Sequence, residues 1–159
     1  MTTATVTMSY EASIGRLVLE SDGDVLVGLW LPNERRHTRN DADGDVPTVL
    51  KETASQLDEY FAGERSDFDV PMELDGTDFQ REVWAELSRI PYGETISYGE
   101  LARRVGRPSA PRAVGQANGR NPIPVIVPCH RVLASNGIGG YGGGLKVKRE
   151  LLALEGVSA

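Results

Sequence analysis

Apolar residues in the first part of the chain come in short runs separated by turn-forming residues. Residues 14–19 and 25–31 are rich in Leu, Val and Ile, and Ser-Asp-Gly-Asp lies between them at 21–24. An Asp-Gly pair between two such runs is typical of a β-hairpin. The pattern over residues 4–31 therefore predicts short strands joined by tight turns.

A helical pattern follows a charged, Gly- and Asp-rich stretch at 33–46, which we interpret as a loop with His37 in solvent. Apolar residues recur at helical spacing from Leu50 to Phe61, and Gly63 predicts the end of that helix. The short acidic stretch 64–76 is expected to be a linker. The first half is thus predicted to be a small α/β unit without an evident catalytic cluster.

The second half is predicted to be mostly helical. Thr77 and Gln80 have the spacing of a capping box, which opens a helix that Pro91 ends. The apolar face of this helix is formed by Phe79, Val83 and Leu87.

Two shorter helices are expected next. Ser97 and Glu100 open the first, which ends at Gly106, and Ser109 is expected to cap the second, which Gly119 stops. Two short helices joined by a Gly-containing turn are typical of a helix-turn-helix, although many helical domains contain such corners.

A proline-rich segment, 121–133, then leads to the only thiol of the sequence. Its three prolines forbid a regular helix and predict a stiff, extended backbone that carries Cys129, followed at once by His130. A final helix is predicted over 145–154, with Glu155 just after it.

Composition excludes several protein classes. One cysteine among 159 residues allows no internal disulfide and no cysteine-rich zinc site. The N-terminus lacks the apolar core of a signal peptide, and no apolar run approaches the ~18 residues of a membrane span. We therefore expect a soluble, cytoplasmic protein with no membrane partner.

Charge is distributed unevenly along the chain. Residues 1–76 carry 6 basic and 16 acidic side chains, whereas residues 97–149 carry nine basic side chains against Glu100 alone. A basic segment in an acidic protein favours an anion site, with nucleic acid as the first candidate. The alternative is a solvated face balanced by the acidic half. Arg112 lies near the start of the second predicted helix of the pair, where recognition helices contact a groove.

Cys129 has two interpretations. A lone cysteine in an apolar stretch can be a buried small hydrophobe. It can also be a nucleophile, in which case its thiol, with a pKa of about 8.5, needs a base nearby. Because neighbouring side chains of an extended segment point to opposite faces, we expect His130 to contact Cys129 through a water, with Glu155 on its other nitrogen.

The glycine-rich tract 137–144 contains a formal G-x-G-x-x-G pattern. It fails as a dinucleotide fingerprint, because no convincing strand precedes it and no acidic residue follows at the required distance. It is either a flexible loop or a pocket wall where backbone amides approach a planar ligand.

Five segments with their order and spacing intact give the sequence a family resemblance. They are Arg112-Ala-Val-Gly, Asn121-Pro-Ile-Pro, Pro128-Cys129-His130-Arg131, Gly-Gly-Tyr141 and Leu-Leu-Ala-Leu-Glu155-Gly. Over residues 77–156 the chain resembles the 6-O-alkylguanine–DNA alkyltransferases. The resemblance implies an α+β protein with a small acidic, ribonuclease H-like α/β domain over 1–76 and a mainly helical DNA-binding domain with a helix-turn-helix over 77–159.

The resemblance also implies a role for each matching residue. Cys129 would attack the alkyl carbon, His130 would take the thiol proton through a water, and Glu155 would orient the imidazole. Asn121 would brace the active-site turn, and Tyr98 would contact the flipped nucleotide and help to neutralise the leaving guanine.

DNA contacts and a guanine pocket are implied as well. Arg112 would fill the gap in the base stack from a helix in the minor groove. The other expected DNA contacts are Tyr98, Ser109, Ala113, Gln116, Arg120 and Arg131. The expected pocket residues are Asn118, Pro124, Val132, Tyr141 and Gly142. Several relatives carry serine at the position of Gly142, and no metal or cofactor is expected.

The predicted function is direct reversal of DNA damage, with the alkyl group passing irreversibly from guanine in double-stranded DNA to Cys129. We expect a monomer that reacts once, because a thioether resists hydrolysis and no second thiol can regenerate it. Three alternatives stay open: a non-catalytic alkyltransferase-like protein that binds lesions, a helix-turn-helix transcription regulator, and a cysteine hydrolase.

Overall fold

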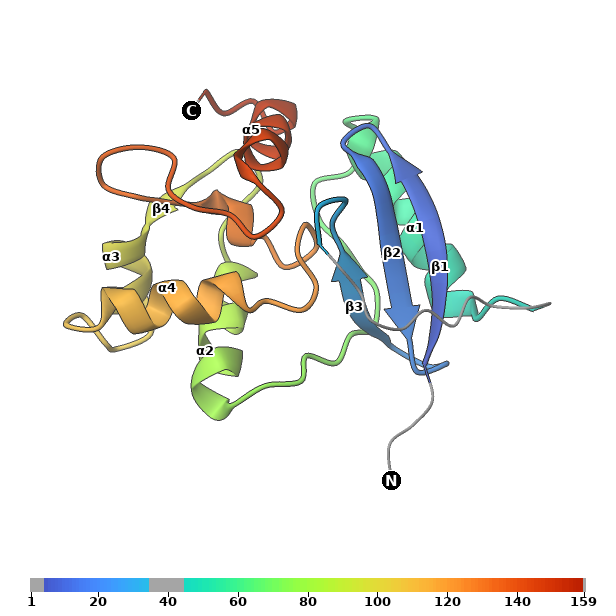
Figure 1. The fold of residues 1–159 in the computed structure, drawn as a ribbon, viewed down its shortest axis with the longest axis horizontal. Coiled ribbons are helices and arrows are strands. Elements are labelled where there is room, and N and C mark those ends of the chain that lie inside the picture. Colours follow the sequence, from blue (N-terminus) through green and yellow to red (C-terminus); the bar gives the residue numbers. More distant parts are fainter. Residues whose placement is uncertain (1–4, 35–44, 159) are drawn as a thin grey trace. The chain divides into compact units, whose positions relative to one another are not determined.

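A computed structural model describes residues 5–34 and 45–158, so His37 and most of the predicted loop at 33–46 lie outside the described residues. The chain divides into two compact units, Met1–Leu74 and Asp75–Ala159. The first unit is a small sheet with a helix and the second is mainly helical, which confirms the mixed α+β class (Figure 1).

The first unit contains a three-stranded antiparallel sheet in the order β1-β2-β3. Its strands are β1 (Val6–Ala12), β2 (Gly15–Ser21) and β3 (Leu26–Trp30), and α1 (Thr48–Phe61) packs on the sheet. The hairpin predicted around residues 21–24 joins β2 to β3. Leu17 and Leu19 alternate with more exposed residues along β2 and are fully buried, because one sheet face forms the core.

Two details of this unit differ from the prediction. Ile14 does not begin a strand but lies in the turn between β1 and β2, just before Gly15, whose φ is 123°. The stretch 64–76 is more than a linker, because the backbone of Leu26 bonds to Pro71 (2.9 Å) and to Glu73 (3.0 Å) at the end of the sheet.

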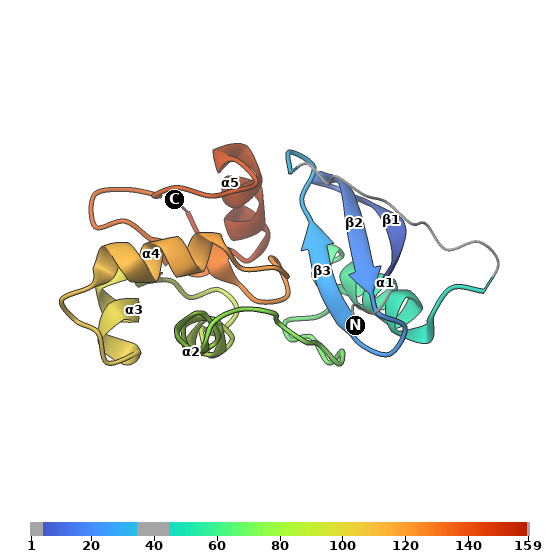
Figure 2. The ribbon, with the colours of Figure 1, turned by 60° about the horizontal axis from the view of Figure 1, so that its bottom comes forward.

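The second unit contains four α-helices among the described residues: α2 (Asp78–Leu87), α3 (Tyr98–Arg104), α4 (Pro111–Gly119) and α5 (Leu145–Leu154). Two short parallel strands, β4 (Ile96–Ser97) and β5 (Val132–Leu133), pair beside them. Figure 2 shows α4 beside α3, as the predicted helix pair requires. The indole of Trp84 in α2 donates to the Ala117 carbonyl (2.9 Å) and ties α4 to the core.

Helix termini test the capping predictions directly. The capping box of Thr77 and Gln80 is present at the start of α2. This helix ends at Leu87, four residues before Pro91. The amides of Arg89 and Ile90 donate to carbonyls three residues back, so the chain leaves α2 through turns of 3-10 type. Ser109 does not cap α4, so that prediction was wrong: Ala110 occupies the cap position without a side-chain bond, and the fixed φ of Pro111 starts the helix.

Across the described ranges, no helix is long and apolar enough to cross a membrane.

Candidate active site

The backbone before Cys129 forms a tight turn instead of the predicted extended path. The amide of Val127 donates to the carbonyl of Ile123 (2.9 Å), and Val125 at the turn has a φ of 75°. A positive φ is costly for a β-branched residue, so the surrounding structure must hold this turn. Val125 and Pro124 are both buried there.

Asn121 holds the two ends of this turn together. Its Nδ2 donates to the carbonyl of Val127 (2.7 Å), and its Oδ1 accepts from the amide of Ile123 (3.0 Å). One buried amide therefore occupies a donor and an acceptor that the turn would otherwise leave unpaired.

Cys129 begins a single turn of 3-10 helix, Cys129–Arg131, immediately after that turn. The Cys129 side chain is buried, and its amide donates to Val127 (2.8 Å). The expectation of an extended backbone at Cys129 and His130 was therefore wrong. Successive side chains of a 3-10 turn still point in different directions, because each residue rotates by about 120°.

His130 lies fully buried against Glu155, which follows α5. Its Nε2 is 2.8 Å from Oε2 of Glu155. Burial lowers the pKa of His130, and the hydrogen bond and negative charge of Glu155 oppose that shift. Nδ1 of His130 is buried and has no hydrogen-bond partner among the described residues. The ring thus has one nitrogen oriented by a carboxylate and one left to accept a proton.

Arg131 was expected to contact DNA, and the structure contradicts this. The residue is only 6% exposed, and its guanidinium bonds to Glu155 and to the carbonyl of Ile90. It also lies over the ring of Tyr92. A side chain fully engaged in the interior cannot reach a phosphate, so we remove Arg131 from the expected DNA contacts.

Tyr98 at the start of α3 lies beside Cys129. Pairing of β4 with β5 aligns Ser97 with Leu133, which places Tyr98 next to the segment that carries the thiol. Burial raises the pKa of Tyr98, the charge of Cys129 raises it further, and a hydrogen bond from Asn118 opposes both. The tyrosine is therefore a neutral hydroxyl at neutral pH.

Gly139 leaves room for the Tyr98 ring. A Cβ at this position would lie 3.2 Å from the ring, which is closer than an ordinary contact, whereas a Cβ on Gly115 would make an ordinary contact at 3.7 Å. Gly139 also has a φ of 77°, which favours glycine. Within the glycine-rich tract, Gly139 thus packs closely against Tyr98, a protein side chain, so the expected wall against a planar ligand stays a prediction.

Lys148 is a buried residue that the sequence reasoning missed, because it was counted in the basic segment. Its side chain is 0% exposed, and Nζ donates to the carbonyls of Val132 (2.8 Å), Ile138 (2.6 Å) and Gly140 (3.1 Å). Burial lowers its pKa to about 8, and the charge of Cys129 opposes this. The sequence did carry a signal of this burial, because Lys148 lies on the apolar face of the final helix, three and four residues before Leu151 and Leu152.

The expected DNA-contacting residues of α4 share one surface. Val114, Ala117 and Asn118 face the core, whereas Arg112, Ala113, Gln116 and Arg120 are exposed. Ser109 is exposed in the turn before the helix. Among the other expected pocket residues, Val132 is buried in β5, Tyr141 is half-buried and Gly142 is exposed.

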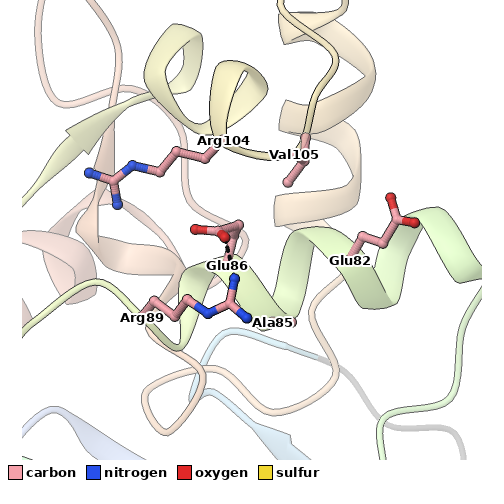
Figure 3. A pocket seen from close by; sticks show the side chains of 6 residues that line it. All are labelled: Glu82, Ala85, Glu86, Arg89, Arg104 and Val105. Atoms are coloured by element: carbon pink, nitrogen blue, oxygen red, sulfur yellow. Dashed lines mark hydrogen bonds and ion pairs between the residues drawn. The ribbon is translucent and has the colours of Figure 1, made fainter.

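A separate pocket lies between α2 and α3 and contains none of the candidate residues (Figure 3). Glu82, Ala85 and Glu86 line it from α2, Arg89 lines it from the turn after α2, and Arg104 and Val105 line it from the end of α3. Arg89 pairs with Glu86, and Arg104 pairs with Glu100. Three of its four charged side chains therefore already have an ion-pair partner. Within residues 5–34 and 45–158, no group of three His, Cys, Asp or Glu residues could hold a metal ion.

Comparison with known families covers nearly the whole chain. Residues 6–74 match the ribonuclease-like domain of 6-O-methylguanine DNA methyltransferase, and residues 78–157 match its DNA-binding domain.

Individual relatives agree with these matches. The methylated-DNA–protein-cysteine methyltransferase of Mycobacterium tuberculosis (strain ATCC 25618 / H37Rv) is 49% identical over 146 residues, which are 91% of this chain and 88% of that protein. The Methanosarcina barkeri protein of the same name is 53% identical over 147 residues, with 91% and 93% covered. A crystal structure of Mycobacterium tuberculosis OGT in complex with DNA has a TM-score of 0.85 and 49% identity, and the match covers 95% of this chain and 91% of that one.

Proposed function

The chain belongs to the 6-O-methylguanine DNA methyltransferase family and repairs DNA by direct reversal, and we propose that Cys129 is the residue that accepts the alkyl group. One observation carries this assignment: the sequence contains a single cysteine. In a family whose members are named for transfer to a protein cysteine, no other side chain of this chain can be the acceptor.

The proposed reaction is a displacement at the alkyl carbon. The thiol proton of Cys129 passes through a water to Nδ1 of His130, and the sulfur then attacks the carbon bonded to the guanine oxygen. A carbon–sulfur bond forms, the carbon–oxygen bond breaks, and its electron pair leaves with guanine. In this proposal, the hydroxyl of Tyr98 donates a hydrogen bond to that leaving group; its position beside the segment of Cys129 and its raised pKa support this.

The proposed substrate is alkylated guanine in double-stranded DNA. The alkyl carbon is inaccessible in a stacked duplex, so the base must leave the stack at a cost of a few kcal/mol. Arg112 and the exposed surface of α4 are the proposed DNA contacts, with the Arg112 side chain filling the gap. DNA binding and transfer then both belong to the part of the chain from residue 77 onward.

We propose that the protein acts as a monomer in the cytoplasm, where a reducing environment keeps a single thiol free. Val132, Tyr141 and Gly142 would form the guanine pocket together with Asn118 and Pro124.

The experiment that tests the function is a titration with duplex DNA that carries one 6-O-methylguanine. Because the thioether of Cys129 cannot be hydrolysed and the chain has no second thiol, repaired lesions should stop increasing at one per protein molecule. Lesion loss is measured by chromatography of the digested DNA. Repair that continues through many turnovers would contradict the acceptor role.

Substituting Arg112 tests the proposed role of α4. In Arg112→Ala, repair of the duplex should slow about 10- to 100-fold, because the cost of base extrusion is no longer offset, whereas repair of the free methylated base should change less. Single-turnover rates on both substrates measure the difference. Arg149→Ala, which removes an equally charged exposed side chain from α5, is the matched control and should leave both rates near those of the parent. Equal losses on both substrates in Arg112→Ala would refute the role.

A further inference from the structure

We propose that Arg131 is a positioning residue that keeps His130 neutral, with its Nδ1 ready to accept a proton, by holding Glu155 as a carboxylate on the opposite side of the imidazole. The inference rests on the role of His130 proposed above. It gives a function to a buried cation that transfer to Cys129 does not otherwise use.

The geometry places Arg131 and His130 on the same carboxylate. Nε of Arg131 is 2.8 Å from Oε1 of Glu155, and Nη2 is 3.0 Å from Oε2. Oε2 is also the atom that lies 2.8 Å from Nε2 of His130. The guanidinium thus contacts both carboxylate oxygens as a fork, which fixes the carboxylate plane that the imidazole meets.

Arg131 is itself held in place on its other side. Its Nη1 donates to the carbonyl of Ile90 (2.6 Å), and its side chain is 7% exposed. The amide of Gly93, in the following turn, contacts Oε1 of Glu155 (3.4 Å). These bonds connect the segment after α2 to the residue that follows α5, so the carboxylate has little freedom to move.

The charges of Glu155 and Arg131 determine whether His130 can act as a base. A buried carboxylate beside an imidazole alone would be compensated by drawing a proton onto the ring. The fixed positive charge of Arg131 already compensates Glu155 and disfavours a second cation on His130.

The charged groups around the imidazole of His130 raise or lower its pKa. Burial is the largest cause of the lowered pKa of His130; Glu155 opposes it, and Arg131 and Lys148 add to it. Cys129 is the adjacent titratable group on the same turn. A carboxylate only accepts hydrogen bonds, so Nε2 of His130 carries the hydrogen and Nδ1 of the neutral ring has a free lone pair.

The test reads the protonation of His130 directly by NMR. The sequence has two histidines, and the signal that disappears in His130→Gln identifies the one of interest. In the parent protein at pH 7, the nitrogen shifts should show a neutral ring with the hydrogen on Nε2. In Arg131→Met, the titration midpoint should rise by about 1–3 pH units. The acidic limb of the pH–rate profile for transfer to Cys129 should move by the same amount.

Arg131→Lys is the matched control. Lysine keeps the positive charge but not the fork, so most of the shift seen in Arg131→Met should be reversed. An imidazolium in the parent protein at pH 7 overturns the inference. If Arg131→Met does not fold, Arg131→Lys takes its place: without the fork its midpoint should still rise, by a smaller amount, and an unmoved midpoint there overturns the inference. A folded Arg131→Met protein that reacts slowly at every pH, with an unmoved midpoint, overturns it too. Failure of the parent protein to alkylate Cys129 would instead refute the proposed function. The NMR titration would still test the role of Arg131, because it needs no substrate.

Discussion

Replacing Cys129 with serine is expected to abolish alkyl transfer and to leave the fold intact. A serine hydroxyl has nearly the shape of the thiol but stays protonated near neutral pH and is a far weaker nucleophile. The rest of the sequence has no thiol that could take over. Lesion loss in a single-turnover assay should therefore equal that of DNA incubated without protein.

The control for this substitution is the stability of the variant. Cys129 is 5% exposed, and the hydrogen bond from its backbone amide to the Val127 carbonyl does not involve the side chain. Because serine has nearly the same size, the free energy of unfolding should change by no more than about 1 kcal/mol. Measurable transfer by a folded Cys129→Ser protein would show that a different group accepts the alkyl group.

Removing Glu155 is expected to have the largest effect on stability. Glu155→Ala leaves the buried guanidinium of Arg131 without its counter-charge and Nε2 of His130 without its acceptor. Breaking a buried ion pair from one side costs about 3–5 kcal/mol. Urea unfolding followed by circular dichroism measures the loss, and transfer to Cys129 should fall with it because the imidazole is no longer oriented.

A nearby glutamate provides the matched control. Glu150 lies in α5 and approaches Lys146 at 3.8 Å on the surface. Exposed pairs of this kind contribute about 0–1 kcal/mol, so Glu150→Ala should unfold at nearly the parent urea concentration. A loss in Glu155→Ala no larger than in Glu150→Ala would mean that the buried network does not stabilise the unit.

Features that depend on local sequence were predictable. The capping box of Thr77 and Gln80 involves residues three apart, and the structure contains both of its bonds. The last helix spans Leu145–Leu154 as predicted, since its apolar spacing and the Gly156 after it are local signals. The motif around Cys129 likewise identified the family that the comparisons show.

Features that depend on partners distant in sequence were not predictable. The positive φ of Val125 contradicts the preference of a β-branched residue and is held by the bonds of Asn121 to both ends of the turn. Arg131 looked like a surface cation because its partner Glu155 is 24 residues away. Lys148 likewise bonds to carbonyls 8 to 16 residues distant, which a count of charges cannot reveal.

Ser109 is a case in which a local sequence signal gave a wrong prediction. Serine is a preferred helix cap, but the proline two residues later sets the start of α4 and leaves Ala110 in the cap position. The error moved a boundary and did not alter which residues of α4 are exposed.

The central claim is that Cys129 takes the alkyl group from guanine and keeps it. Peptide mass spectrometry of the parent protein, after incubation with duplex DNA that carries one 6-O-methylguanine, tests this most directly. The account predicts that the peptide with Cys129 gains one methyl group and that no other peptide does. A folded protein whose Cys129 peptide stays unmodified while the lesion disappears from the DNA would contradict it.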